Sequence, residues 1–293
     1  MKYYLTYDHI CNKFAKIFFM INNSIHIIKG SNNKDILIDV SFKETVRNKK
    51  IIVFSHGFKG FKDWGCFNLI AKIFADHNFV FIKFNFSHNG TTVSNPQEFV
   101  DLTAFGNNNF SKDLNDLSLL LDWIENSSEF SSEIYLLGHS RGGSISILKA
   151  GEDKRVKKVI SWASPSDLLN RISEEKINQW KENKVIYVYN GRTKQDMPLY
   201  LQFHDDTINN RQRFNIQNAV TNLSIPQLII HGDIDSTVEP QEAKLMHEWN
   251  RSSELLLIKN GDHVFGASHP FDRDDLPKHL REAVNKTIDF VNL

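Results

Sequence analysis

Short, continuous apolar runs recur along this chain, and they constrain its fold more than any other feature. Six of them, near residues 51, 80, 134, 158, 228 and 255, do not alternate apolar with polar residues. Such runs are typical of strands that are buried on both faces of a parallel sheet. Two further runs begin at Ile25 and Ile36. The sequence therefore predicts a mostly parallel central sheet of about eight strands.

Helical patterns lie between these runs, and the clearest one begins at Ser111. Its apolar residues recur at steps of three and four, which places them on one face of a helix: Leu114, Leu117, Leu121 and Ile124. We expect Ser111 to be the N-cap, because its hydroxyl can accept a hydrogen bond from a free N–H of the first turn. Strands that alternate with flanking helices predict the α/β class.

The alternation stops between about residues 166 and 220. This stretch contains polar helical segments and the sequence VIYVYNGRTKQDMPLYLQF, in which Asn190-Gly191 separates two strand-like runs. Asn-Gly favours a tight hairpin turn, since both residues tolerate positive φ. We interpret the stretch as a cap that is inserted over the sheet. The predicted units are an N-terminal arm (1–24), a core (25–165 and 217–293) and the cap (166–216).

Charge and cysteine content argue against several classes of protein. The 293 residues include 35 basic and 35 acidic side chains, and the formal net charge is zero. A nucleic-acid-binding surface usually needs an excess of basic residues, so we expect no nucleic acid partner. Cys11 and Cys66 lie far apart and form no CxxC pair. This favours neither a disulfide framework nor a cysteine zinc site.

The first residues carry one short apolar patch, IFFMI. The patch is too short to cross a bilayer, which takes about 20 apolar residues. The segment also has no long apolar stretch followed by the small-residue cleavage site of a secretory leader. We therefore expect no membrane span and a cytoplasmic location, with this segment forming an extra helix or a partly ordered arm.

The segment EIYLLGHSRGGSISILKA carries the strongest functional signal. An apolar run leads into GHSRG and then into a helix rich in small residues. A sharp turn between strand and helix would hold Ser140 on a strained corner, where Gly138 and Gly142 avoid collisions. The N–H of Arg141, at the start of the helix, could donate to a developing oxyanion. A bare G-x-S-x-G is common by chance, but this setting predicts that Ser140 is a nucleophile.

In this strand–turn–helix setting the chain resembles the α/β-hydrolase superfamily, in which nucleophile, acid and histidine follow in that order. The resemblance places the acid three residues beyond the glycine that ends QLIIHG, at Asp235. Asp233 is the rival, although it would also serve as a turn residue that bonds to nearby backbone amides. The loop GDHVF after ELLLIKN supplies His263 as the base. His269 is the alternative, and it would otherwise be a surface or packing histidine.

The segment FSHGFKGFKDWG follows the run IIVFS directly. The resemblance implies that the backbone N–H groups of Phe58 and Arg141 form the oxyanion hole. Loss of one such donor typically lowers the rate about 10²- to 10³-fold. We expect His56 to bond loops together beneath the site without titrating in the reaction. The side chains of His139 and Arg141 are predicted to be structural or to line the pocket.

These parts predict acyl transfer. A serine hydroxyl is a poor nucleophile until an imidazole takes its proton, and Asp235 would hold the imidazole tautomer and stabilise its charged form. The acyl group would pass to Ser140, and water activated by His263 would release the acid. This chemistry requires no metal or organic cofactor. The sequence has no HExxH, no P-loop and no strand-linked GxGxxG.

Further segments narrow the resemblance to small microbial esterases of the cinnamoyl and feruloyl type. They are HGFKGFKDWG, FNFSHNG, GHSRGG, NGRT, HGDIDSTV and GDHVFGASHP, within about residues 25 to 290. The resemblance implies a serine hydrolase that cleaves a carboxylic ester, with aryl and cinnamoyl-type esters among the candidates. The aromatic side chains of the cap either line an acyl or aryl pocket or form the core of the cap: Trp180, Tyr187, Tyr189, Tyr200 and Phe203.

Other activities on the same triad stay open at this point. Acylaminoacyl and prolyl oligopeptidase-type peptidases, thioesterases and acyltransferases share the fold, and fold alone does not choose among them. Only about 50 residues precede the HGF segment, which counts against the oligopeptidases. A ligand-binding homologue without catalysis is a further alternative, although it would typically lack a triad member. The sequence does not predict the oligomeric state.

Overall fold

Eight strands form one central sheet in the part of the chain that the structure describes. The structure is a computed structural model, and it describes residues 21–43, 50–127 and 133–293. The strand order is β1-β2-β4-β3-β5-β6-β9-β10, in which the pairs β1–β2 and β2–β4 are antiparallel and the other pairs are parallel. The predicted sheet is therefore confirmed. Its strands are β1 (Ile21–Lys29), β2 (Asp35–Lys43), β3 (Ile51–Ser55), β4 (Val80–Phe84), β5 (Ile134–His139), β6 (Val156–Trp162), β9 (Gln227–Gly232) and β10 (Glu254–Ile258).

The burial of each strand follows its place in the sheet. Every residue of the central strands β3 and β4 is buried, as continuous apolar runs predict. In the edge strand β1, exposed residues alternate with half-buried ones, and Ile25 and Ile27 are exposed. This strand begins at Ile21, so residues 21–24 belong to the sheet and not to the predicted N-terminal arm. The pairing of Ile21 with Lys43 on β2 explains the earlier start.

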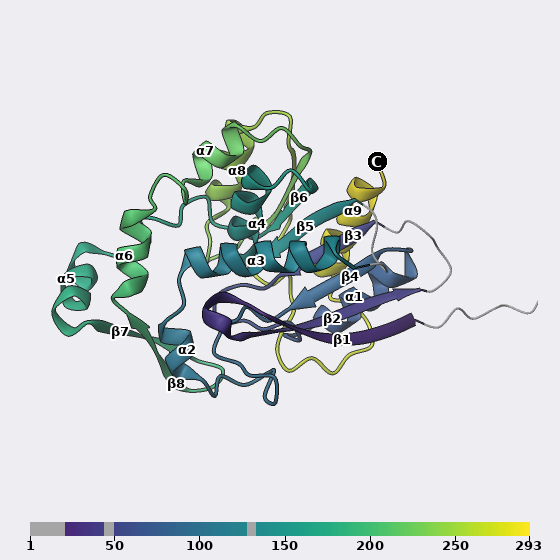
Figure 1. Ribbon diagram of the computed structural model, residues 1–293. Coiled ribbons are helices and arrows are strands. Elements are labelled where there is room, and N and C mark those ends of the chain that lie inside the picture. Colours follow the sequence, from purple (N-terminus) through teal and green to yellow (C-terminus); the bar gives the residue numbers. More distant parts are fainter. Residues whose placement is uncertain (1–20, 44–49, 128–132) are drawn as a thin grey trace, which may run out of the picture.

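Helices cover both faces of the sheet (Figure 1). Helices α3 (Phe110–Glu125), α4 (Arg141–Glu152), α7 (Ile216–Thr221) and α8 (Pro240–Trp249) contribute to one hydrophobic core, while α1 (Phe67–Asp76) and α9 (Lys278–Asn292) contribute to a second core. The two cores lie on opposite faces of the sheet, because neighbouring strand residues point to opposite sides. The remaining short helices before β5 are η1 (Ser31–Asn33) and α2 (Leu102–Gly106).

The helix predicted from Ser111 is present, but it begins one residue earlier, and its N-cap is not Ser111. Asn109 is the cap, and its side chain accepts a hydrogen bond from the N–H of Lys112 at 2.9 Å. Ser111 lies inside the first turn, where its hydroxyl donates to Asp206 of α6 (Gln202–Asn209) at 2.6 Å. The tertiary contact with α6 therefore uses the hydroxyl that the local pattern assigned to capping.

Between β6 and β9 the chain leaves the sheet and forms α5 (Glu174–Asn183), the hairpin β7 (Val185–Asn190) and β8 (Gln195–Tyr200), and then α6 and α7. Helix α5, the hairpin and α6 lie at the carboxyl ends of the parallel strands, on the left in Figure 1. The predicted hairpin is confirmed, but its turn is not the tight Asn-Gly turn. Asn190 pairs with Gln195, which leaves four loop residues, and the positive φ is at Lys194 (55°). Loops of this length close by other turn geometries.

Two predictions concern segments that are described only in part. Cys66 is buried and has a free thiol, whereas Cys11 and residues 1–20 of the predicted arm lie outside the described residues. Burial raises the pKa of the Cys66 thiol to about 11. Within the described ranges, no helix combines the length and the apolar character that a membrane crossing would need.

Candidate active site

Ser140 occupies the sharp turn between β5 and α4. Its backbone has φ 54° and ψ −129°, a region that residues with a side chain rarely adopt, and its N–H donates to the carbonyl of Trp162 at 2.8 Å. The turn is possible because two glycines allow close packing. A Cβ on Gly138 would lie 2.3 Å from the carbonyl oxygen of Gly142, and one on Gly142 would lie 2.2 Å from that of Ser55. The strained corner that the sequence predicted is thus present.

Three residues from separate loops meet at this corner. His263, in the loop after β10, has its Nε2 3.1 Å from Ser140 Oγ and its Nδ1 2.8 Å from Asp235 Oδ2. Asp235 follows β9 and is buried, while His263 is partly exposed. Parallel strands bring their carboxyl ends to one edge of a sheet, and that is why residues more than 120 positions apart converge here.

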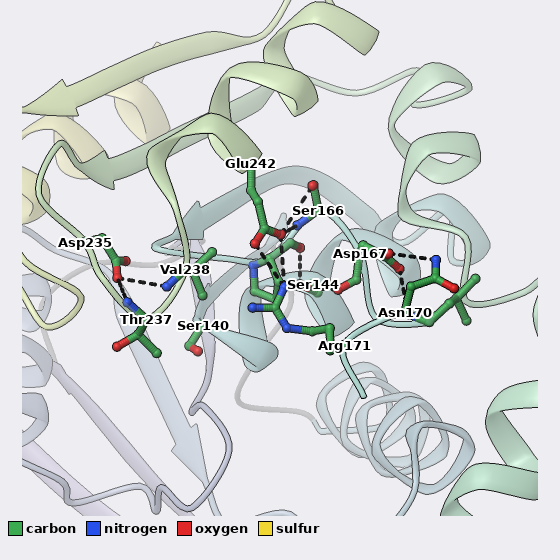
Figure 2. A network of polar contacts seen from close by, with 12 residues as sticks. Ser140, Ser144, Ser166, Asp167, Asn170, Arg171, Asp235, Thr237, Val238 and Glu242 are labelled. Carbon is green, nitrogen blue, oxygen red and sulfur yellow. Dashed lines mark hydrogen bonds and ion pairs between the residues drawn. The ribbon is translucent and has the colours of Figure 1, made fainter. Parts of the chain in front are cut away.

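The carboxylate of Asp235 has other hydrogen-bond partners besides His263. Its Oδ1 accepts hydrogen bonds from the N–H groups of Thr237 (2.8 Å) and Val238 (2.9 Å), as Figure 2 shows. The Nε2 of the buried His231 lies 3.2 Å from its Oδ2. Burial raises the pKa of Asp235, but the bonds from His231, His263 and Val238 outweigh it and hold the pKa well below its usual range. The carboxyl is therefore ionised at neutral pH.

Sequence reasoning missed His231 as a neighbour of the acid. It lies in β9, within QLIIHG, where every residue is buried. A polar side chain in a buried strand needs a hydrogen-bond partner, and this requirement could have pointed to a neighbour such as Asp235. Here Nε2 also lies 2.9 Å from the carbonyl oxygen of Val238.

The two rival residues lie outside this chain of hydrogen bonds. Asp233 accepts a hydrogen bond from the N–H of Asn260 at 2.6 Å, which fits the role of a turn residue that bonds to backbone. His269 accepts from the N–H of Gly65 at 3.0 Å, and its ring packs against that of Phe61. The structure thus brings together Ser140 and the two residues that were preferred for the acid and the base.

The loop after β3 lies directly against Ser140. A Cβ on Gly57 would lie 3.0 Å from the Cβ of Ser140, so the backbone that carries Phe58 passes beside the serine. His56 is buried below this loop, and its Nδ1 lies 2.9 Å from the carbonyl oxygen of Gly57. Burial lowers the pKa of His56 to about 4. His56 is therefore neutral at pH 7, as expected for a residue that binds loops together.

His139 and Arg141 flank Ser140 and make different contacts. His139 Nε2 lies 2.8 Å from the carbonyl oxygen of His263, and burial lowers the pKa of His139 to about 3. Its neutral ring therefore donates to the loop that carries His263. The Arg141 guanidinium donates from Nε to the buried Asp113 at 3.0 Å. It also faces three aromatic rings at 5.2 to 5.5 Å, those of Phe58, Phe110 and Phe203.

A large cavity of about 920 Å³ opens beside Ser140 and His263. Trp180 and Phe203, two of the predicted cap aromatics, line it, and Trp180 also donates to the carbonyl of Leu199 at 2.7 Å. Tyr187 and Tyr189 were candidates for the pocket or for the core of the cap, but both are exposed and do not line the cavity. They occupy the outer face of β7, where alternation turns Ile186, Val188 and Asn190 inward instead. The ring of Tyr200 packs against Gly106 of α2.

Much of the apolar wall comes from residues that sequence reasoning did not single out. They include Leu168, Leu169, Ile172, Ile177, Val188 and Leu199. The first three follow β6 in a loop that is tied to α8, as Figure 2 shows: Glu242 accepts from the N–H of Ser166 at 2.7 Å and pairs with Arg171 at 3.0 Å. Three apolar residues in one loop are too few to establish the period of a helix or of a strand, so only the tertiary contacts reveal the wall.

Comparison with known proteins identifies the fold. No protein-family model matches the sequence, and no curated protein matches it. Among solved structures, Est1E from Butyrivibrio proteoclasticus with bound ferulic acid is 16% identical, with a TM-score of 0.69 over 91% of this chain and 97% of that one. The α/β hydrolase GrgF from Penicillium sp. sh18 is 16% identical, with a TM-score of 0.69 over 92% and 97%. A putative hydrolase from Agrobacterium vitis S4 is 18% identical, with a TM-score of 0.66 over 93% and 98%.

At these identities the likeness establishes the fold and not the activity. The chain has the α/β-hydrolase fold, as the strand–turn–helix around GHSRG predicted. The likeness to Est1E extends over nearly the whole chain, because the match covers 91% of this chain and 97% of Est1E.

Proposed function

We propose that this protein is a serine hydrolase that cleaves a carboxylic ester through an acyl-enzyme on Ser140. One observation carries the proposal: a continuous chain of hydrogen bonds runs from Ser140 Oγ through both ring nitrogens of His263 to the buried carboxylate of Asp235. This is the arrangement that activates a serine hydroxyl, since the imidazole can take the proton while the carboxylate stabilises its charged form.

In the first step, Ser140 Oγ attacks the ester carbonyl carbon as its proton passes to His263 Nε2. The tetrahedral intermediate carries an oxyanion, for which we propose the backbone N–H groups of Phe58 and Arg141 as donors. The intermediate collapses when the C–O bond to the alcohol breaks and His263 returns the proton to the leaving oxygen. In the second step, water gives a proton to His263 and attacks the acyl carbon, and the acid leaves as Ser140 regains its proton.

We propose that residues 166–216 act as a cap that holds the apolar part of the ester. The cavity of about 920 Å³ between this segment and Ser140 is lined mainly by apolar side chains, which suits an extended acyl or aryl group. The bound ferulic acid of Est1E is an example of such a group in a protein of the same fold.

A cytoplasmic location of the protein stays a prediction from its sequence.

Labelling with a fluorophosphonate tests the nucleophile. The wild type is expected to be modified at one serine, and Ser140→Ala is expected to stay unlabelled. Ser144→Ala is the matched control: Ser144 lies one turn further along α4, and its hydroxyl donates to the carbonyl of Pro165 at 2.6 Å (Figure 2). This control should label like the wild type. A wild type that does not react would overturn the proposal.

A panel of substrates tests whether the protein cleaves an ester, a thioester or an amide bond. Short and long nitrophenyl esters, methyl ferulate, an acyl-CoA and an aminoacyl arylamide are compared, with Ser140→Ala as the blank. We expect the esters to be preferred and kcat in Ser140→Ala to fall about 10⁴-fold or more, because triad residues act as a unit. Preference for the arylamide would assign the protein to the peptidases, and preference for acyl-CoA would assign it to the thioesterases.

A further inference from the structure

A second cavity, of about 290 Å³, opens on Ser140 and His263. It shares Phe58, Lys59 and these two residues with the large apolar cavity, but its remaining lining is different. That lining comes mainly from the loop after β3, the tip of the β7–β8 hairpin and the loop after β10, with Phe67 of α1 and His139 of β5. Ser140 therefore lies where two chemically distinct cavities meet, as expected for a site that holds both halves of an ester.

The smaller cavity is rich in positive charge. Lys59 and Arg192 both line it, and none of its described lining residues is Asp or Glu. No carboxylate in the described ranges lies within ion-pair distance of Lys59 or Arg192. The charge of Glu98 acts on Arg192 only from a greater distance. In the wall of the large cavity, Arg141 is paired with Asp113 and Arg171 with Glu242.

Both cationic side chains are held by contacts that leave their charge unneutralised. Lys59 Nζ donates to the carbonyl oxygen of Tyr189 at 3.0 Å, which links the loop after β3 to the hairpin. The Arg192 guanidinium lies over the rings of Phe61 and Phe99, at 5.1 and 5.5 Å. Such contacts orient a cation without cancelling its charge.

Lys59 lies in a tightly folded part of the loop after β3. Lys59 has φ 56°, in the left-handed region, where glycine is favoured and a side chain costs about 1 kcal/mol. Burial also lowers the pKa of Lys59. Lys59 is thus half-buried beside Ser140 and has no carboxylate partner, so its charge is available to a bound anion.

We propose that Lys59 and Arg192 bind an anionic group on the substrate, so that the preferred esters carry an apolar group on one side of the ester bond and a carboxylate or similar anion on the other. The apolar group occupies the large cavity and the anion occupies the smaller one. This inference rests on the proposed ester hydrolysis and names the substrate class that the same site selects. Lys59 is half-buried and Arg192 is exposed, so solvent screens both charges and each contributes a modest preference.

The test compares near-isosteric esters that differ in charge. One pair consists of the octanoate esters of 4-hydroxybenzoate and 4-hydroxybenzamide, with the charge in the alcohol half. The other consists of the 4-nitrophenyl monoesters of suberic acid and of its monoamide, with the charge in the acyl half. We expect kcat/KM to favour the anionic member of one pair by about tenfold. If the first pair shows the preference, the alcohol half of the ester lies beside Lys59 and Arg192; if the second pair shows it, the acyl half lies there.

Variants then assign the preference to the two side chains. Lys59→Gln and Arg192→Gln should each lower the anionic-to-neutral ratio, and the double variant should bring it close to one. Arg192→Lys keeps the positive charge, so it should keep part of the preference for the anionic ester. Lys194→Gln is the matched control, because Lys194 lies on the same hairpin with φ 55° but does not line the cavity. Its ratio should equal that of the wild type.

Two results would overturn the inference: a wild-type ratio at or below one for both pairs, or an unchanged ratio in the double variant. A purely structural role of the two side chains would lower the turnover of both esters and leave the ratio unchanged. Raising the salt concentration from 0.05 to 0.5 M should reduce the ratio in the wild type and not in the double variant. Ser140-dependent turnover of the neutral esters shows separately whether the proposed hydrolysis itself holds.

Discussion

Four residues beside the candidate site have backbone conformations that residues with side chains rarely adopt. Ser140, Lys59, Ala163 and Phe265 have φ between 48° and 56°. Each such residue costs of order 1 kcal/mol or more, so contacts must hold it in place. For Ser140 and Ala163 these contacts are hydrogen bonds to neighbouring strands, since their N–H groups donate to Trp162 and Ile230 at 2.8 Å. Hydrogen bonds to the parallel sheet thus keep these two residues in their strained conformations beside the candidate site.

Two nearby aspartates allow a residue-scale prediction about the acid. Asp235→Asn should lower kcat on a nitrophenyl ester about 10⁴-fold, because a neutral amide cannot stabilise the charged imidazole of His263. Asp233→Asn is the matched control. Its side-chain oxygen can still accept from the N–H of Asn260, so kcat should stay within a few-fold of wild type. The reverse outcome, with loss of activity only in Asp233→Asn, would move the acid to Asp233.

The structure brings together the three residues that the sequence predicted for the triad, whereas most of the residues that line the pocket were not predicted. Ser140, Asp235 and His263 each follow a recognisable strand, and the order of the strands along the chain predicts which loops meet. Tyr187 and Tyr189 lie in neither the pocket nor the core of the cap, because nothing in the local sequence says which face of an isolated hairpin turns toward the core. Lys59 and Arg192 lie far apart in sequence, and only the tertiary structure places them in one cavity.

At the scale of elements, the close approach of α4 to the strands beneath it determines where Ser140 lies. Gly142, in the first turn of α4, packs against the carbonyl oxygens of Ser55 and His56 at the end of β3. Any side chain here would push the helix away from the loop that carries Phe58. Gly151, near the end of the same helix, has open space around it, and the nearest atom to an added Cβ is 3.8 Å away on Ala219.

This contrast gives an element-scale prediction. Gly142→Ala should lower the free energy of unfolding by about 2 kcal/mol or more and should also reduce kcat, because helix and loop must separate. Gly151→Ala should instead raise the free energy of unfolding by up to about 1 kcal/mol, since alanine is favoured over glycine in a helix. Urea denaturation of both variants checks this. A Gly142→Ala variant as stable as Gly151→Ala would contradict the close packing.

For the molecule as a whole, histidines with lowered pKa make stability depend on pH. Burial lowers the pKa of His56 and His88 to about 4 and that of His139 to about 3. The unfolded chain binds protons at these histidines near pH 6.5, while the folded chain does not, so stability is lost as the pH falls below 6.5. Asp116 acts in the opposite direction, because burial raises its pKa to about 6.

We therefore expect the free energy of unfolding to fall between pH 7 and pH 5, by about 2 kcal/mol for each of the three histidines, with a smaller offset of about 1 kcal/mol from Asp116. His88→Gln should lose less stability over this range than the wild type. His77→Gln, at an exposed position, should behave like the wild type. Urea unfolding at pH 5, 6 and 7 measures the difference. Equal losses in all three proteins would show that His88 does not contribute.

The class of fold, the positions of the strands along the chain and the residues at their ends could be predicted from the sequence. This was possible because buried strands need continuous apolar runs and a serine on a sharp turn needs small neighbours, and both requirements are local. The tertiary structure alone decided the N-cap of α3, the inward face of β7, the wall from Leu168 to Ile172 and the cationic cavity. These features depend on contacts between segments that lie far apart in the sequence, and local sequence patterns do not predict which segments meet.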